Sequence, residues 1–219
     1  PAKIVTIRNG VDTTKFAPNN DDSVLKEFGI TGRFAMFVGR ITRQKGLAHL
    51  LRAWKDVPAE FGLVLAAGSP DEEGIGNEVA ALIAELQSTR SNVWWIKEML
   101  PHDQLTAMLT AADLFICPSI YEPLGIVNLE AMGCETAVLG SRVGGIPEVV
   151  ADKETGELVD YHGEAAPFEK ALTESITRLM SQPDLLKKYG AAGRARAQKL
   201  FGWDAVADLT VDLYRRVIV

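Results

Sequence analysis

The stretch that decides the fold reads CPSIYEPLGIVNLEAM and covers residues 117–132. It follows an apolar run from Asp113 that predicts a buried strand, and Pro118 and Pro123 bound an irregular turn after it. From Gly125 onward, the apolar spacing predicts a helix that packs on a sheet. The start of such a helix has free backbone N–H groups and about half a positive charge. The stretch therefore predicts an anion site, where Gly125 lets a ligand approach the backbone closely.

Two glutamates flank this predicted helix start, Glu122 in the turn before it and Glu130 within the helix. At a rise of about 1.5 Å per residue, Glu130 lies roughly 7 to 8 Å from the helix start, which is about the reach from a bound pyrophosphate to its ribose. An acidic residue at that distance can accept hydrogen bonds from ribose hydroxyls. A plainer interpretation has one glutamate complementing the helix dipole and the other solvated. The stretch alone favours neither interpretation.

Composition and charge are those of an ordinary globular protein. The chain is 47% hydrophobic and 24% charged, and its net charge of −6 argues against a general surface for nucleic acid or anionic membranes. The two cysteines, Cys117 and Cys134, stand singly in apolar contexts, so neither a metal site nor a disulfide framework is expected. No apolar run reaches membrane-spanning length and no signal peptide opens the chain. We therefore expect a cytoplasmic protein with no membrane span and no nucleic-acid partner.

Predicted strands and helices alternate along the chain. The strands are expected at residues 2–7, 34–38, 61–67, 93–96, 113–117, 137–140 and 157–159. The helices are expected at residues 22–28, 47–54, 78–87, 103–112, 165–180, 183–199 and 203–217, besides one that starts at Gly125 and one opened by residues 144–148. The acidic segment 71–77 is expected to be a loop, because it lacks the third glycine of a dinucleotide fingerprint. The cluster of Arg194, Arg196 and Lys199 is expected on a solvated helix face. This alternation predicts a doubly wound parallel α/β sheet with helices on both faces, in one domain over residues 1–219.

A basic loop with the sequence GRITRQKG, residues 39–46, is the second candidate for a binding element. Its three cations suit a negatively charged ligand, although the spacing fits a solvated loop about as well. Position favours the ligand, because ligands of open parallel sheets bind beyond the carboxyl ends of the strands. Both this loop and the Glu122 turn leave strands at that end. For the segment GGIPE, residues 144–148, a close turn between helix and strand is favoured over direct ligand contact.

Four motifs in this order resemble the C-terminal, donor-binding domain of retaining GT-B glycosyltransferases. They are RNGVD at residues 8–12, Gly39-Arg40 with Lys45-Gly46, YEPLG at 121–125 with Glu130, and GGIPE at 144–148. The runs 38–46 and 118–132 are most similar to bacterial glycogen synthases of the actinobacterial type. The resemblance covers nearly the whole chain and implies the Rossmann-like C-terminal half of a GT-B fold.

The resemblance also implies a nucleotide-sugar donor and assigns roles to residues. Arg40 and Lys45 would hold the diphosphate, and Glu122 would sit beside the transferred sugar, which makes these three the implied catalytic residues. Glu130 would bind the ribose. The implied donor-binding set further comprises the region near Met99 for the base, the backbone of Gly125 and Ile126 for the distal phosphate, and Gly39, Pro123, Leu124 and Val127. No cofactor and no metal is expected, because two cations and a helix start can neutralise most of the charge of a departing diphosphate.

By this resemblance, the chain is expected to be the donor half of a retaining enzyme that moves glucose from ADP-glucose to an α-glucan. Enzymes of the family have an N-terminal domain that binds the acceptor and supplies a catalytic histidine, and we expect that domain to be missing here, with Pro1 a cut inside a longer protein. His49, His102 and His162 match no such motif. The helix 203–217 is expected to leave exposed a face that crosses back to the missing domain. Alone, the chain is expected to bind nucleotide and transfer little sugar.

Two other functions fit the same architecture. One is half of a nucleotide-sugar epimerase or of a phosphorylase, although the chain has no motif for either. The other is a module that keeps the fold for binding or assembly without catalysis. One local departure from the family pattern is Glu135, in the loop GCETA at residues 133–137, where a glycine is usual. We expect it to alter that turn without touching the donor site.

Overall fold

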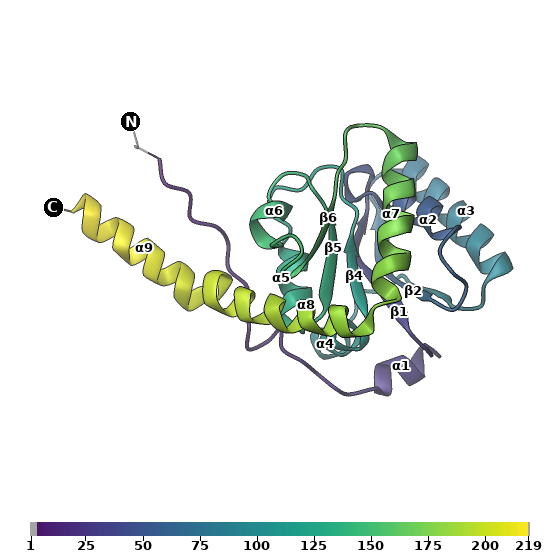
Figure 1. The fold of residues 1–219 in the computed structure, drawn as a ribbon, viewed down its shortest axis with the longest axis horizontal. Helices are drawn as coiled ribbons and strands as arrows, with labels where there is room; N and C mark the ends of the chain where they lie inside the picture. The colour runs from purple at the N-terminus through teal and green to yellow at the C-terminus, as the bar shows by residue number, and fades with distance from the viewer. Residues whose placement is uncertain (1–3, 219) are drawn as a thin grey trace.

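The computed structural model describes residues 4–218 and is built on a six-stranded parallel sheet (Figure 1). The strands are β1 (Phe34–Ile41), β2 (Gly62–Pro70), β3 (Val93–Ile96), β4 (Leu114–Cys117), β5 (Ala137–Ser141) and β6 (Gly156–Val159). Their spatial order is β3-β2-β1-β4-β5-β6. The chain therefore builds outward from β1 to β3 and then returns to add β4 on the other side of β1, where Ala35 pairs with Leu114. This order confirms the doubly wound prediction, and the reversal between β1 and β4 is the place where such sheets bind ligands.

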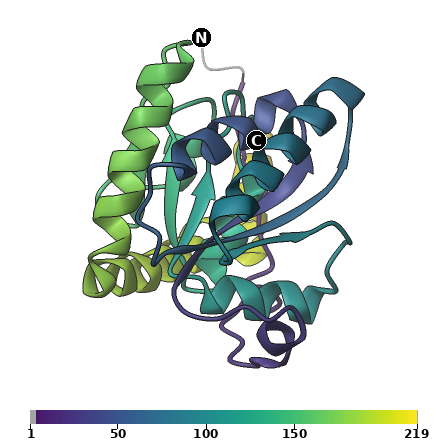
Figure 2. The ribbon, with the colours of Figure 1, turned by 90° about the vertical axis from the view of Figure 1, so that its right-hand side faces the viewer.

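Helices cover both faces of the sheet, because alternate residues of each strand point to opposite sides. In β1, Ala35 and Phe37 belong to one apolar cluster, whereas Phe34 and Met36 belong to the other. The first cluster is covered by α2 (Leu47–Trp54), α3 (Glu73–Thr89) and α7 (Ala165–Met180), which lie side by side in Figure 2. The second is covered by α1 (Ser23–Glu27), α4 (His102–Ala111), α5 (Ile126–Gly133) and α6 (Ile146–Val149).

The last part of the described chain leaves the sheet. Helix α8 (Pro183–Arg196) lies at the amino ends of the strands and passes through a π-helical turn (Ala197–Phe201) into α9 (Trp203–Val217). Helix α9 runs away from the sheet, and residues 4–10 extend toward the same side (Figure 1). Helix α9 has no buried residue, and its exposed side chains include Leu209 and Tyr214. Within residues 4–218, none of the helices combines the length and hydropathy needed to cross a membrane.

Two predicted elements differ in the structure. Residues 4–7 form no strand and Ile4 is 89% exposed, while residues 2 and 3 lie outside the described part. The segment runs away from the sheet, so it has no neighbouring strand to share hydrogen bonds. The predicted loop at 71–77 is also partly wrong, because α3 already begins at Glu73. The helix begins here although its first residues include Gly74 and Gly76. A Cβ at position 76 would stand 2.7 Å from the Pro70 side chain, so the absence of a side chain at Gly76 allows the helix to pack on the end of β2.

The basic cluster on α8 is not a solvated face. Arg194 donates hydrogen bonds to the carbonyls of Gly133 and Phe16, and Arg196 donates to those of Val149 and Glu148. These carbonyls include ones at the ends of α5 and α6, where a cation is favourable. Lys199 is exposed as expected. The sequence prediction was wrong for the two arginines because their partners come from helices far away in the chain.

Candidate functional site

The candidate site lies beyond the carboxyl ends of β1 and β4, where three loops meet. They are the basic loop at residues 39–46, the turn after β4 that contains Glu122, and the loop that contains Gly144 and Gly145. The first is the basic loop, which is tied to the turn after β4 by a 2.8 Å hydrogen bond from the Ile120 N–H to the Gln44 carbonyl. Gly46 has a φ of 67°, and a Cβ there would stand only 1.9 Å from the Pro118 carbonyl oxygen. A glycine is therefore needed at position 46 for the basic loop to press against the turn after β4.

The loop that contains Gly144 and Gly145 contacts the Glu122 turn on the side opposite to the basic loop. The Gly145 N–H donates to the Glu122 carbonyl at 2.9 Å, and a Cβ on Gly144, whose φ is 52°, would stand 1.9 Å from the same oxygen. Residues 142–145 form the short connection between β5 and α6, as expected of a close turn between a strand and a helix. The contact with Gly145 also fixes the backbone of Glu122 between two loops that are distant in the sequence.

Lys45 and Glu122 form an ion pair in the middle of these loops. The Lys45 Nζ lies 2.6 Å from Glu122 Oε2, and their side chains are only 19% and 10% exposed. Ser119, itself buried, donates a longer hydrogen bond of 3.4 Å to the same carboxylate oxygen. Glu122 is therefore not the solvated glutamate of the plainer interpretation. Removing one partner of a buried pair typically costs about 3–5 kcal/mol, so each charge depends on the other.

Helix α5 begins directly beside this pair. Gly125 is its N-terminal cap with a φ of 85°, and no side chain caps the helix. The first N–H groups of the helix are therefore free of side-chain partners and aimed at the site, which is the arrangement that binds anions. Ile126 is 39% exposed and Val127 half-buried at this start. Of the two preceding residues in the implied donor set, Pro123 is exposed and Leu124 is half-buried.

Glu130 lies one turn further into α5 and has no charged partner. No ion pair or side-chain hydrogen bond of Glu130 is found within residues 4–218. Burial raises the pKa of its carboxyl group above the ordinary value, because the charged form loses hydration. A desolvated, unpaired carboxyl group costs folding stability, and such groups concentrate at functional sites. Its position makes it available to a ligand that continues from the helix start.

A cavity of about 470 Å³ opens at the carboxyl-terminal parts of β1 and β2 and the segment after β3. It brings together three residues of the predicted set, Gly39, Arg40 and Met99. The Arg40 side chain is exposed and has no ion-pair partner in the described part of the chain, and Met99 is 96% exposed. The remaining lining residues are Val38, Ala66, Gly68, Ser69, Lys97, Glu98, Leu100 and Leu105. The predicted residues thus fall into two groups, one in this cavity and one around the start of α5.

Sequence reasoning missed several residues of the site. The apolar cavity wall formed by Val38, Ala66 and Leu100 could have been found, because these residues stand at or just past the ends of three adjacent parallel strands. Two buried polar residues beside Glu122 were also missed, Ser119 and Asn128. Their signal was a polar residue inside an otherwise apolar pattern. No cluster of three or more side chains suited to hold a metal ion occurs in the described residues.

Comparison with known proteins relates the chain to one family. The family model described as "Glycosyl transferases group 1" matches residues 22–196. Alpha-maltose-1-phosphate synthase of Mycolicibacterium smegmatis is 47% identical in an alignment 223 positions long that covers 99% of this chain and 58% of that protein. A D-inositol 3-phosphate glycosyltransferase of Segniliparus rotundus is 36% identical and is covered over 48% of its length. The structure of sucrose-phosphate synthase from Thermosynechococcus elongatus superposes with a TM-score of 0.81 and 30% identity over 97% of this chain and 52% of that one. The chain thus spans about half the length of these relatives.

Proposed function

Because the chain belongs to the glycosyl transferases group 1 family and has the Rossmann-like fold of the C-terminal half of a GT-B enzyme, we propose that residues 1–219 are the donor-binding domain of a retaining hexosyltransferase. The observation that supports this most directly is the contact between Lys45 and Glu122 at the start of α5. A cation, an acid and a free helix start meet there at the switch point of the sheet. Such a site suits a ligand that combines a diphosphate with a sugar.

In this proposal the donor extends from the cavity to the ion pair. The base lies near Met99, and the diphosphate lies between Arg40, Lys45 and the backbone of Gly125 and Ile126. Glu130 accepts hydrogen bonds from the ribose hydroxyls. Glu122, a buried residue, stands beside the transferred sugar at the inner end of the site. The burial of Glu130 without a partner supports this arrangement, because ribose hydroxyls would supply the donors that its carboxylate lacks.

The proposed chemistry breaks the bond between the anomeric carbon and the diphosphate oxygen. Negative charge develops on the departing nucleoside diphosphate, and two cations and the helix start are placed to stabilise it. The oxygen of the acceptor hydroxyl then bonds to the anomeric carbon on the same face that the diphosphate left, and the hydroxyl proton passes to the departing diphosphate oxygen. The acceptor binds outside this chain, so the domain alone binds donor and transfers little sugar.

The finer assignment is transfer of a glucosyl unit from ADP-glucose, with an α-glucan as the expected acceptor. The relatives named above include an alpha-maltose-1-phosphate synthase and a D-inositol 3-phosphate glycosyltransferase, and none of those named is a glycogen synthase. Maltose contains glucose units, which supports glucose as the transferred sugar. The same name makes a phosphorylated sugar a second acceptor to be tested beside the α-glucan.

Calorimetric titration of the chain with ADP, ADP-glucose, UDP and UDP-glucose tests the proposal. The wild-type chain should bind at least one nucleotide, and Lys45→Ala should weaken binding by about tenfold or more, because charge-assisted hydrogen bonds contribute about 1.5–3 kcal/mol. Arg43→Ala is the matched control. Arg43 lies in the same loop but faces Glu72 and Glu78, so its loss should change affinity little. A folded sample that binds none of the four ligands, or equal binding by the Lys45→Ala variant, would contradict the proposal.

A further inference from the structure

Asn128 has a buried side-chain amide whose only polar side-chain contact is the weakly bonding thiol of Cys117, among the residues that the structure describes. Asn128 lies in the first turn of α5 and is 0% exposed, and neither its Nδ2 nor its Oδ1 has a conventional hydrogen-bond partner within residues 4–218. Its backbone N–H is satisfied by the Gly125 carbonyl at 2.9 Å, so only the side chain is unpaired. Buried amides in folded proteins are nearly always hydrogen-bonded, which means that an orphan pair of polar atoms needs an explanation.

The side chain of Asn128 reaches back toward the start of the helix, as side chains in a first turn do. Its Nδ2 lies 2.5 Å from the point where a Cβ on Gly125 would stand. The Cγ atom of Glu122 lies 3.3 Å from the same point. The unpaired amide and the stem of the Glu122 side chain therefore border one small space under the turn.

The carboxylate of Glu122 points to a different partner in this structure. It accepts from Lys45 Nζ at 2.6 Å, with Ser119 at 3.4 Å as a weaker donor. A diphosphate that binds Lys45 competes directly with Glu122 for the same ammonium group. Once that ammonium turns to the phosphate, the carboxylate remains buried and negative, and it needs another donor. One unused side-chain donor near the stem of Glu122 is the Asn128 amide, since its Nδ2 and the Glu122 Cγ lie 2.5 and 3.3 Å from the same point beside Gly125.

We propose that Asn128 is a positioning residue that takes over the carboxylate of Glu122 from Lys45 when a diphosphate binds. In the ligand-free state Glu122 pairs with Lys45, and in the bound state Asn128 Nδ2–H donates to Glu122 while Lys45 holds the phosphate. The exchange keeps Glu122 charged and oriented beside the transferred sugar without a cation. This inference rests on the proposed function for its bound state, but the exchange of partners can be tested without any ligand.

The first experiment removes Lys45 and observes the Asn128 side-chain amide by ¹H–¹⁵N NMR. The resonance is assigned by its loss in an Asn128→Leu variant. Lys45→Met frees Glu122, so the amide proton of Asn128 should shift downfield as it begins to donate to the carboxylate. The shift should be absent in Arg43→Met and in the double variant Lys45→Met, Glu122→Leu. An unchanged Asn128 resonance in a folded Lys45→Met variant would overturn the inference.

The second experiment compares nucleotide binding by two variants of Asn128. Asn128→Leu replaces the orphan amide with an apolar group of similar size, so the variant should fold. Its affinity for each nucleoside diphosphate and nucleotide sugar that the wild type binds should fall by about tenfold, the effect of one hydrogen bond to a charged group, because every one of these diphosphates takes Lys45 from Glu122. Asn128→Gln, which keeps the donor, should recover part of that affinity.

The two claims fail separately. If the wild type binds nucleotide and nucleotide sugar, and Asn128→Leu binds each of them as tightly as the wild type does, the role of Asn128 is refuted and the proposed function stands. If the wild type binds neither ligand, the proposed function fails. The NMR result for Lys45→Met then decides the exchange of partners by itself.

Discussion

Glu122→Gln should tighten the binding of a nucleoside diphosphate, although it removes a residue of the proposed site. The reason is competition for Lys45, whose Nζ lies 2.6 Å from the Glu122 carboxylate in the ligand-free chain. A phosphate has to displace this carboxylate. Hydrogen bonds to charged groups contribute about 1.5–3 kcal/mol and neutral ones about 0.5–1.5 kcal/mol, so an amide competes less by about 1–1.5 kcal/mol. The expected gain in affinity for ADP or UDP is therefore about tenfold.

The assay is calorimetric titration at one fixed ionic strength, because exposed phosphates are screened by salt. The gain should disappear in a Lys45→Met background, since the competition needs both side chains, and a double-mutant cycle measures this coupling directly. Glu154→Gln is the control for net charge, because Glu154 is an exposed residue in the connection between α6 and β6 and has no place in the proposed site. Unchanged or weaker binding of nucleoside diphosphate by Glu122→Gln, or a gain that persists without Lys45, would refute the competition.

Three further predictions concern stability. Burial raises the pKa of the Glu130 carboxyl group in the folded chain. The contribution of this group to folding stability is therefore full below the unfolded pKa of about 4.3 and is lost as the pH rises through the raised folded value. Glu130→Gln should be more stable than the wild type in urea at pH 7, and this gain in stability should shrink toward pH 4. Glu135→Gly should raise the thermal midpoint through about 0.5–1 kcal/mol of relieved backbone strain, as should Lys153→Gly, because their φ angles are 63° and 61°. Gly190→Ala should lower the free energy of unfolding by about 1–3 kcal/mol in urea titrations, because its Cβ would stand 1.9 Å from the Glu135 carbonyl oxygen.

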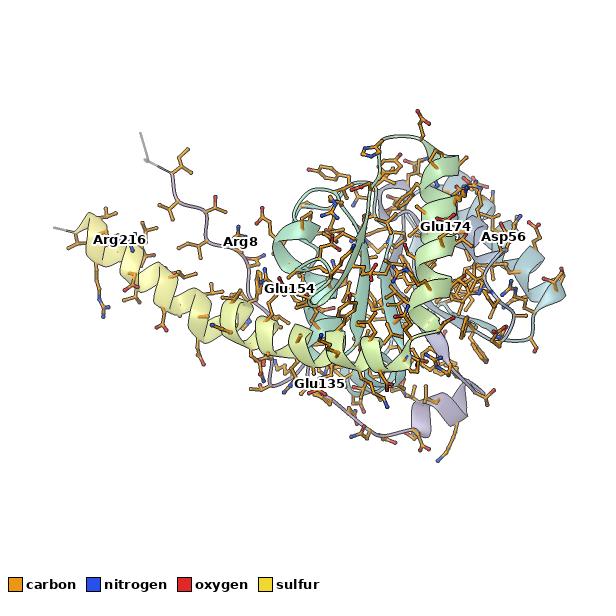
Figure 3. The ribbon with its side chains drawn as sticks, viewed as in Figure 1. Arg8, Asp56, Glu135, Glu154, Glu174 and Arg216 are labelled. Atoms are coloured by element: carbon orange, nitrogen blue, oxygen red, sulfur yellow. The ribbon has the colours of Figure 1, made fainter. Side chains whose placement is uncertain are left out.

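Much of the fold followed from local patterns in the sequence. The strand 93–96 and the helices 47–54, 165–180 and 203–217 have the bounds that were predicted. The paired position of the basic loop and the Glu122 turn was also predictable, because both follow parallel strands and their carboxyl ends share one edge. Glu135 was expected to alter its turn, and it has a left-handed backbone at the amino end of β5, beside α8 and at the opposite end of that strand from the candidate site (Figure 3).

The errors share a physical origin, which is that burial is decided by segments distant in the sequence. Glu122 is buried because the loops of Gly46 and Gly144 close on its turn, and no local pattern reports that approach. Arg194 and Arg196 are drawn inward by carbonyls at the ends of α5 and α6. A basic cluster on a helix looks the same in sequence whether its partner is water or a distant backbone oxygen.

Buried polar side chains in α5 lack the partners that a buried acid elsewhere in the structure has, and this difference supports a ligand-binding role for the candidate site. Glu157, away from the start of α5, is 8% exposed and held by both terminal nitrogens of Arg178. In α5, by contrast, Glu130 is desolvated without a cation, and the side-chain amide of Asn128 is buried without a conventional hydrogen-bond partner. Apolar side chains at both positions would stabilise the helix more, because unsatisfied buried polar groups cost about 1–3 kcal/mol each. A helix optimised for stability alone would not keep both polar groups beside its free N-terminal N–H groups, whereas a ligand that bonded to Glu130 and released Glu122 to Asn128 would recover that cost on binding.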